Sequence, residues 1–390
     1  MSNGSDIYEV PWNSDRWELA LFERPDIMFM GARGRWVLYR PSRVVVTAKA
    51  LRSGRVRQAV RRLKADRADG EQAEVAKALR MELLHAPEDG EVELVREINQ
   101  LVPRSASLDH VQLPGPHRVH GDDDPIPAED PGDIPGSGDA GADLTVLVLD
   151  TGCTSETAKQ LGVTMDADDE EIVDDDHDGL RDPAAGHGTH VAGIVARLAP
   201  GASIVPRRLL TSPVGEASDL EVAAALLDHG GADIITCSFG EMTLDDAPPI
   251  VVGQALAALP STTVVVAAAG NAGVQRPEWP AAFENVIAVG AAGQPPSTTD
   301  WLQTDFSNFG GWVDCCAPGV GIVSTFVTRP GEGFASGYAA WTGTSMAAPA
   351  VAGTIAALAS NVGLAQAVLD VTGLPTLGAI GAFVDPGQLL

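Results

Sequence analysis

The apolar positions along the chain follow one pattern after residue 143 and another before it. After residue 143, short and nearly continuous apolar runs predict strands that are buried on both faces of a sheet. These runs are LTVLVLD, ASIVPRRLL, ADIITCSF, TTVVVAAAG and NVIAVGAA. The stretches between several of them predict helices, namely HGTHVAGIVARLA, SDLEVAAALLDHG and PIVVGQALAAL. This alternation predicts an α/β fold with a mostly parallel central sheet, in which chemistry gathers at the carboxyl ends of the strands.

The earlier part of the chain shows shorter elements, and residues 1–120 predict a small α+β module. GRWVLYRPSRVVVTA predicts two short strands around a turn, LRSGRVRQAVRRLKADR a basic amphipathic helix, residues 71–80 a second helix, RMELLHA a strand, EVELVREINQLV a helix and LDHVQLPGPHRV an extended end. Residues 121–142 are rich in Pro, Gly and Asp, as linkers often are. The sequence thus predicts a module (1–120), a linker (121–142) and a larger domain (143–390).

Charge is unevenly distributed between these parts. The formal net charge of the chain is −27. Residues 1–120 carry 19 Lys or Arg and 17 Asp or Glu, whereas the remaining residues carry 7 and 36. An acidic surface of this kind repels phosphate, so nucleic acid is not an expected partner. A slightly basic module with a basic helix is instead expected to dock on the acidic domain.

The first residues of the sequence, MSNGSDIYEVPWNSDRWELALF, lack the basic start and apolar core of a secretory signal. No apolar run approaches the roughly 18 residues of a membrane span. We therefore expect a cytoplasmic protein without a membrane partner. In that reducing environment the cysteines are expected to be small buried hydrophobic residues rather than disulfides.

Four polar residues stand at predicted strand ends or helix starts. Asp150 follows LTVLVL and Asn271 follows VVVAAAG, while His187 and Ser345 precede helical stretches. A serine hydroxyl becomes a nucleophile when an oriented base removes its proton, and an amide can donate to the oxyanion that forms. Simpler roles exist: Ser345 can cap a helix, Asn271 can sit in a turn, and His187 with His190 can bind a metal. All four in this order predict acyl-transfer chemistry, with His187 rather than His190 as the base.

Residues of about 143–390 resemble the subtilisin-like serine peptidases, or subtilases. The segments that carry the resemblance are VLVLDTG, GHGTHVAG, ITCSFG, AAAGNAG, VDCCAPG and GTSMAAPAVAG. The resemblance implies a three-layer α/β fold and chemistry that requires no cofactor. It also implies a triad of Asp150, His187 and Ser345, with Asn271 and the backbone N–H of Ser345 as oxyanion donors. Subtilases often have His where this chain has Ala350, but that position has none of these catalytic roles.

The resemblance further implies how a polypeptide substrate binds. Two edges would pair with an extended substrate. These edges contain Gly215 in SPVGEAS and Ser238, Phe239 and Gly240 in CSFG. Glu278, in RPEWPAAF, would border the pocket for the residue that precedes the cleaved bond, where a carboxylate favours Lys or Arg. The alternative for Glu278 is a surface ion pair with Arg276.

An acidic run lies between Asp150 and His187, and ten of the seventeen residues 166–182 are Asp or Glu. Asp174, Asp176 and Asp178 occupy alternate positions before a glycine, as at the start of a calcium loop. The bidentate Glu expected at position twelve of such a loop is absent. The run therefore predicts either a structural calcium site or a solvated acidic loop.

These features predict a serine endopeptidase that acts on a polypeptide, in controlled or dedicated processing rather than general turnover. The competing hypothesis is a catalytically silent subtilase fold that binds peptides or regulates. The module of residues 1–120 has two interpretations: an inhibitory propeptide whose extended end occupies the active site, or a permanent domain that recruits a substrate or partner.

Overall fold

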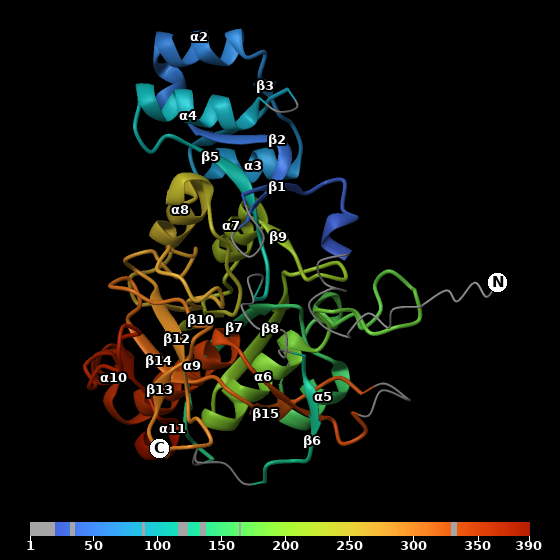
Figure 1. Cartoon of the computed structure of the whole chain (residues 1–390), viewed down its shortest axis with the longest axis vertical. Helices are drawn as coiled ribbons and strands as arrows, with labels where there is room; N and C mark the ends of the chain where they lie inside the picture. Colours follow the sequence, from blue (N-terminus) through green and yellow to red (C-terminus); the bar gives the residue numbers. More distant parts are fainter. Residues whose placement is uncertain are drawn as a thin grey trace, which may run out of the picture.

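The computed structural model describes residues 20–31, 36–87, 90–115, 124–132, 138–163, 165–328 and 334–390. The first part of the described chain is an antiparallel sheet with helices packed on it (Figure 1). Its strands are β1 (Met28–Met30), β2 (Val37–Thr47), β3 (Asp66–Arg67), β4 (Met81–His85) and β5 (Ala106–Gln112). Its helices are η1 (Ala50–Arg52), α2 (Gly54–Arg62), α3 (Glu71–Ala78) and α4 (Glu91–Leu101). These strands and helices form an α+β arrangement.

Strand β2 corrects one detail of that prediction. The segment predicted as two strands around a turn is a single strand of 11 residues. Its pairing with β5 shifts register between Tyr39 and Val44, and Ser42 between them has a φ of 63°. The turn-like residues therefore form a bulge inside one strand, which bends the strand without ending it.

The second part contains, within the described residues, an eight-stranded sheet that is parallel except for β13. The strand order is β17-β14-β12-β11-β10-β7-β8, with β13 paired to β12. Its strands are β7 (Thr145–Asp150), β8 (Ser203–Arg208), β10 (Ile234–Cys237), β11 (Val264–Ala268), β12 (Ile287–Gly293), β13 (Leu302–Gln303), β14 (Cys315–Pro318) and β17 (Ala382–Phe383). All five runs predicted as buried strands lie in this sheet.

Helices cover both faces of the large sheet, and alternate residues of β7 show why. Val146 and Val148 face one core with α6 and α9, whereas Leu147 and Leu149 face another with α7 and α8. Their bounds are α6 (His187–Leu198), α7 (Asp219–Leu227), α8 (Ile250–Ala258) and α9 (Thr344–Val362). The other helices of this part are α5 (Ser155–Leu161), η2 (Ala167–Asp169), η3 (Leu244–Asp246), α10 (Leu364–Thr372) and α11 (Pro386–Leu389). The result is a three-layer α/β arrangement.

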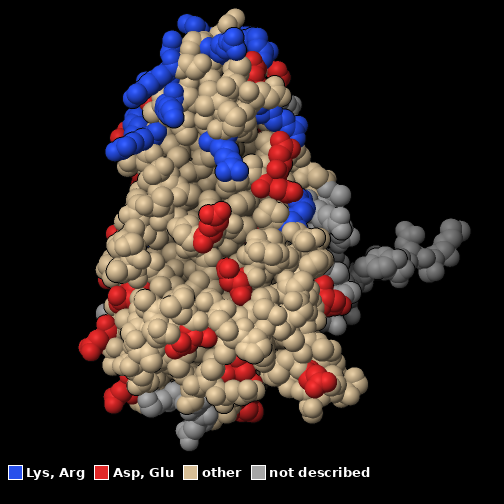
Figure 2. Space-filling view, turned by 90° about the vertical axis from the view of Figure 1, so that its left-hand side faces the viewer, with Lys and Arg blue, Asp and Glu red and all other residues tan. Residues whose placement is uncertain are grey.

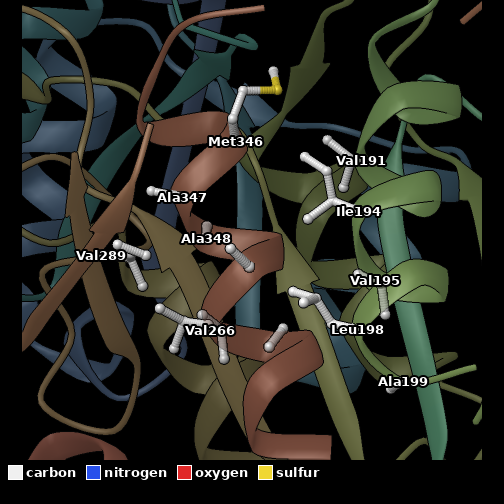
Figure 3. Close-up of a cluster of buried hydrophobic side chains, with 14 of the residues drawn as sticks. Val191, Ile194, Val195, Leu198, Ala199, Val266, Val289, Met346, Ala347 and Ala348 are labelled. Atoms are coloured by element: carbon white, nitrogen blue, oxygen red, sulfur yellow. The ribbon is translucent and has the colours of Figure 1, made fainter. Parts of the chain in front are cut away.

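The core between α6 and α9 is close-packed. Figure 3 shows side chains of α6 facing α9, and Ala347 and Ala348 of α9 lying towards Val266 and Val289 of the sheet. A Cβ on Gly353 of α9 would lie 2.9 Å from Leu198 of α6, so only a residue without a side chain allows this approach. Contrary to the sequence expectation, α9 is long and apolar enough to cross a membrane, but 72% of that apolar window is buried here. We therefore describe α9 as a core helix.

Two smaller features connect the parts. A three-stranded antiparallel sheet joins β15 (Ile322–Thr325), β16 (Tyr338–Trp341) and β6 (Ile126–Ala128). Strand β6 lies inside the segment predicted to be linker, so part of that segment is ordered against the larger domain. Strand β5 of the module pairs with β9 (Ala217–Ser218), which leads into α7.

Figure 2 shows Lys and Arg gathered over the end of the molecule that the module forms.

Candidate active site

Asp150 and His187 meet at the carboxyl end of the sheet. Asp150 is the last residue of β7, and His187 is the first residue of α6. The imidazole Nδ1 lies 2.7 Å from Oδ1 of Asp150, and that same oxygen accepts a hydrogen bond from the N–H of Thr151 at 2.8 Å. The indole ring of Trp341 contacts the imidazole edge-to-face, with ring centroids 5.3 Å apart. With Nδ1 bound to the carboxylate, Nε2 is the nitrogen left for proton transfer.

The start of α6 explains the position of His187. Gly186 caps the helix with a φ of 92°, and a Cβ there would lie 2.3 Å from the ring of Phe326. A larger residue would therefore displace the helix start and its histidine. His190, one turn later, points elsewhere: its Nε2 contacts the carbonyls of Ile322 and Ala339, each at 3.1 Å. Burial lowers the pKa of His190 to about 3, which keeps it neutral.

Ser345 lies in the first turn of α9, and a proline further along shapes its surroundings. Pro349 lies inside this helix and has no N–H, so it cannot donate to the carbonyl of Ser345 four residues earlier. The hydroxyl of Ser238 donates to that carbonyl instead, at 2.9 Å. In return, the Ser345 hydroxyl donates to the carbonyl of Ser238 at 3.1 Å. This reciprocal pair fixes the start of α9 against the residue that follows β10.

Asn271 lies beside the same helix start. Its Oδ1 accepts hydrogen bonds from the N–H of Thr344 at 2.9 Å and from the Thr344 hydroxyl at 3.0 Å. The hydroxyl of Thr344 in turn accepts from the N–H of Gly270 at 3.0 Å. Because Oδ1 is held by Thr344, the amide presents Nδ2 as its free donor group. The N–H of Ser345, in the first helical turn, has no acceptor within its own helix. The site therefore combines two donors beside one hydroxyl.

The end of the module lies between the two edges predicted to bind substrate. Leu113 exchanges two backbone hydrogen bonds with Gly240, at 3.3 and 3.0 Å. Extending this antiparallel register by two residues places Gly115 opposite Ser238, the residue tied to Ser345. On the other side, β5 pairs with β9, and a Cβ on Gly215 would lie 3.2 Å from Pro114.

Phe239 and Glu278, also predicted to bind substrate, are both buried. Phe239 is buried in the core with a relative exposure of 1%, so its side chain does not line the cleft. Glu278 is also buried, and its Oε2 accepts a hydrogen bond from Asn308 at 2.8 Å. A Cβ on Gly240 or Gly270 would lie 2.8 or 2.0 Å from its carboxylate oxygens. The alternative of a surface ion pair for Glu278 is wrong.

Arg276, the partner in that alternative, instead forms an ion pair with Asp246 at 2.6 Å. The carboxylate of Glu278 thus lies against two backbone segments of the site, at Gly240 after β10 and at Gly270 after β11. This position could not be predicted from the sequence, because a single residue separates Arg276 from Glu278, whereas Gly240 is distant in sequence.

The acidic run folds differently from a calcium loop. Asp174, Asp176 and Asp182 bring carboxylate oxygens within 4.8 Å of one another, and Asp178 is not among them. Oδ1 of Asp178 instead accepts from the N–H of Leu180 at 2.7 Å. Burial raises the pKa of Asp182 to about 6. Clustered carboxylates offer the ligands that calcium prefers, so calcium remains a prediction, with Asp182 in place of Asp178.

The residues of this site fall within a match to a known family. The model of the subtilase family matches residues 141–367, more than half of the chain. The chain belongs to the subtilase family. The fold and the resemblance read from the motifs are thereby confirmed.

This subtilase is 38% identical over 242 residues to the thermophilic serine proteinase of Bacillus sp. (strain AK1), covering 57% of this chain and 55% of that protein. It is 34% identical over 232 residues to thermitase of Thermoactinomyces vulgaris, covering 57% of this chain and 76% of that protein. The chain thus spans about half the length of the first of these relatives. The crystal structure of fervidolysin from Fervidobacterium pennivorans, a keratinolytic enzyme related to subtilisin, matches with a TM-score of 0.60 at 21% identity. That match covers 90% of this subtilase and 61% of fervidolysin, and it shows the shared fold.

Proposed function

We propose that this subtilase is a serine endopeptidase in which Ser345 is the nucleophile, His187 the general base and Asp150 the residue that orients the imidazole. The 2.7 Å hydrogen bond between His187 and the buried carboxylate of Asp150 carries the proposal. It fixes the ring so that Nε2 is available to a hydroxyl, and the carboxylate stabilises the imidazolium that forms. The subtilase relatives named as proteinases support the same activity.

The proposed reaction begins when the Ser345 hydroxyl rotates away from the carbonyl of Ser238. Nε2 of His187 takes its proton while Oγ bonds to the substrate carbonyl carbon. The resulting oxyanion accepts hydrogen bonds from Nδ2 of Asn271 and the N–H of Ser345. His187 then gives the proton to the leaving amine, the C–N bond breaks, and water hydrolyses the acyl ester by the reverse sequence. Loss of one oxyanion donor in such a site lowers kcat by about 10²–10³.

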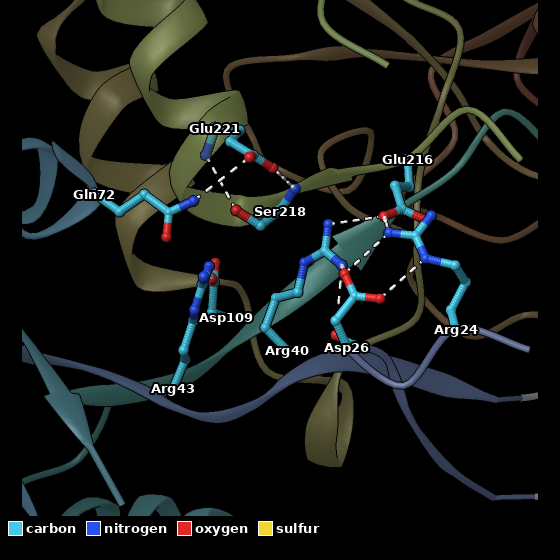
Figure 4. Close-up of polar contacts among 9 residues, drawn as sticks. All are labelled: Arg24, Asp26, Arg40, Arg43, Gln72, Asp109, Glu216, Ser218 and Glu221. Carbon is cyan, nitrogen blue, oxygen red and sulfur yellow. Dashed lines mark hydrogen bonds and ion pairs between the residues drawn. The ribbon is translucent and has the colours of Figure 1, made fainter. Parts of the chain in front are cut away.

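We propose that the module of residues 1–120 inhibits the enzyme by filling the cleft. Its end, residues 106–115, which we call the tail, pairs with both edges predicted to bind substrate, at Ala217–Ser218 and at Gly240, as an extended substrate would. Polar contacts support the same position: Figure 4 shows Arg24 and Arg40 converging on Glu216, beside β9. Further along, Asp219 accepts from the side chain of Gln112 at 2.7 Å and contacts the ring of His110 at 2.8 Å.

The sequence of the tail favours a module that stays attached at this point. Continued by two residues beyond Leu113, the register would bring the carbonyl of Gly115 towards Ser345, and Pro116 follows Gly115 in the sequence. The leaving nitrogen of that bond would belong to a proline ring, where His187 must deliver a proton. Gly115 also has no side chain to fill a specificity pocket. We therefore propose that the tail acts as a resistant peptide, which supports controlled rather than general proteolysis.

Glu278 supports a preference for substrates with Lys or Arg before the cleaved bond. Its carboxylate lies against the backbones of Gly240, in the predicted substrate edge, and Gly270, which precedes the proposed oxyanion donor Asn271. A long basic side chain that entered between these backbones would approach the carboxylate and form a charge-assisted hydrogen bond. Because the site is buried, a neutral side chain of similar length would gain much less.

The silent alternative rests on one observation: in this structure Ser345 donates to Ser238 rather than to His187. Hydrolysis of fluorogenic peptides with Arg, Lys, Leu or Phe before the bond, by wild type and Ser345→Ala, separates the two functions. The endopeptidase predicts turnover that depends on Ser345, and mass spectrometry should find the Gly115–Pro116 bond intact. Equal hydrolysis by both proteins, or none by folded wild type after the tail is cut elsewhere, favours the silent module.

A further inference from the structure

A buried carboxylate outside the proposed triad joins the two segments that carry Asp150 and His187. Glu171, in the acidic run, is 4% exposed. Within the described part of the chain, no Lys or Arg forms an ion pair with it. Such a charge is stabilised by hydrogen bonds alone, so its donors show what it holds in place.

The donors to Glu171 flank the catalytic pair on both sides. Oε1 accepts from the Thr151 hydroxyl at 2.5 Å and from the N–H of Gly186 at 2.7 Å. Oε2 accepts from the N–H of Thr189 at 3.1 Å and from the Thr189 hydroxyl. Thr151 directly follows Asp150, and its N–H binds the same carboxylate oxygen that His187 contacts. Gly186 directly precedes His187.

The hydrogen bonds to Glu171 favour its ionised form, whereas burial raises the pKa of its carboxyl. Two of its four partners are backbone N–H groups, which can only donate, and a carboxylate accepts from all four. Gly186 is the cap residue before α6 and Thr189 lies in the first turn of that helix, where free N–H donors and the helix dipole favour a negative charge. The backbone N–H of Glu171 donates to the carbonyl of Cys153 at 3.1 Å, and this bond holds the segment that carries Glu171 in place.

We infer that Glu171 is a positioning residue, which fixes the end of β7 and the start of α6 so that Asp150 and His187 keep their hydrogen bond and the imidazolium remains favoured. The inference rests on the proposed catalytic roles of Asp150 and His187. The N–H of Gly188 also donates to the hydroxyl of Thr151, at 2.8 Å, and this contact completes the connection between the end of β7 and the start of α6. Among the described residues, the ionisable groups that act on Glu171 include Asp150, the last residue of β7, and Cys153, which follows that strand.

The test uses the full chain with Ser345→Ala, so that the readout needs no turnover. Proton NMR of the downfield His187 Nδ1 hydrogen reports the bond to Asp150 and its titration. Glu171→Gln removes a negative charge and reverses one donor contact, so we expect the signal to move and its titration midpoint to fall by about 0.5–1 pH unit. Glu170→Gln is the matched control, because Glu170 binds Ser155 at the surface.

Kinetics on the Ser345-containing chain, measured after the tail is cut, provide the second readout. We expect Glu171→Gln to lower kcat by about 10–100-fold with KM within about two-fold, since a misplaced catalytic group lowers kcat. Glu171→Asp, which keeps the charge, should retain the titration midpoint. If Glu171→Gln does not fold, Thr151→Val takes its place and should shift the signal in the same way. An unchanged midpoint and kcat, with only a lower melting temperature, would overturn the inference. An absence of turnover with a shifted signal would instead count against the proposed activity alone.

Discussion

The contact between the module and the cleft depends on a buried charge that one substitution removes. Glu216, with a side chain 2% exposed, follows Gly215 at the edge of the cleft. It forms ion pairs with Arg24 at 2.5 Å and Arg40 at 3.0 Å, whose side chains are 26% and 12% exposed. Asp26 bridges the same two guanidinium groups (Figure 4). Glu216→Gln keeps the shape and removes the charge that both arginines face.

The expected effect follows from this burial. Removing one partner of a fully buried pair costs about 3–5 kcal/mol, whereas exposed pairs contribute about 0–1 kcal/mol. Arg24 is partly exposed and Asp26 remains, so we expect the docked tail to lose about 2 kcal/mol. That loss corresponds to about a thirty-fold larger open population.

Hydrogen exchange of residues 106–112 in full-length Ser345→Ala measures that population directly. We expect the exchange rates of this segment to rise about thirty-fold in Glu216→Gln. The control is Asp245→Asn, which breaks the ion pair with Arg96 between the same two parts, where the side chains are 57% and 51% exposed. The control should change exchange by less than about five-fold. Unchanged exchange in Glu216→Gln, or an equal rise in the control, would refute this reasoning.

Three further predictions follow from single contacts. Ser238→Ala should destabilise the protein by about 1 kcal/mol in denaturant unfolding, because the carbonyl of Ser345 loses its donor; Pro349→Ala should recover most of that loss by supplying an N–H. Glu278→Gln should lower kcat/KM for peptides with Arg before the bond by about 100-fold and leave Leu peptides unchanged; equal losses for both would exclude the specificity role. Burial raises the pKa of Asp109 to about 6, so wild type should lose about 2–3 kcal/mol of unfolding free energy as pH rises from 4 to 7; parallel pH curves for wild type and Asp109→Asn would contradict this.

The fold could be predicted largely because its signals are local. In the run LTVLVLD, residues 146–149 are all apolar and face the two cores in turn, so the run indicates a strand buried on both faces. Strand β2 was read wrongly because a bulge at Ser42 and a turn have the same local composition. The β6 strand was missed because its partner, β16, lies about 210 residues away.

The residues of the site also divide into those that local motifs predict and those that only contacts between distant segments reveal. The motifs predicted Asp150, His187, Asn271 and Ser345, and the structure brings the first two into hydrogen-bond contact. Glu171 was not singled out, because nothing in a run of carboxylates distinguishes the one that turns inward. The signal for Ser238 was present, since Pro349 leaves the carbonyl of Ser345 without a helical donor, but its partner could be found only in three dimensions.

The central claim is that Ser345 is a nucleophile activated by His187. A fluorophosphonate probe forms a stable adduct with an activated serine, and mass spectrometry locates it. In the full chain carrying Glu216→Gln, which loosens the tail, we predict an adduct on Ser345 that His187→Ala abolishes. No adduct on Ser345 in this folded protein, or the same labelling rate without His187, would contradict the account.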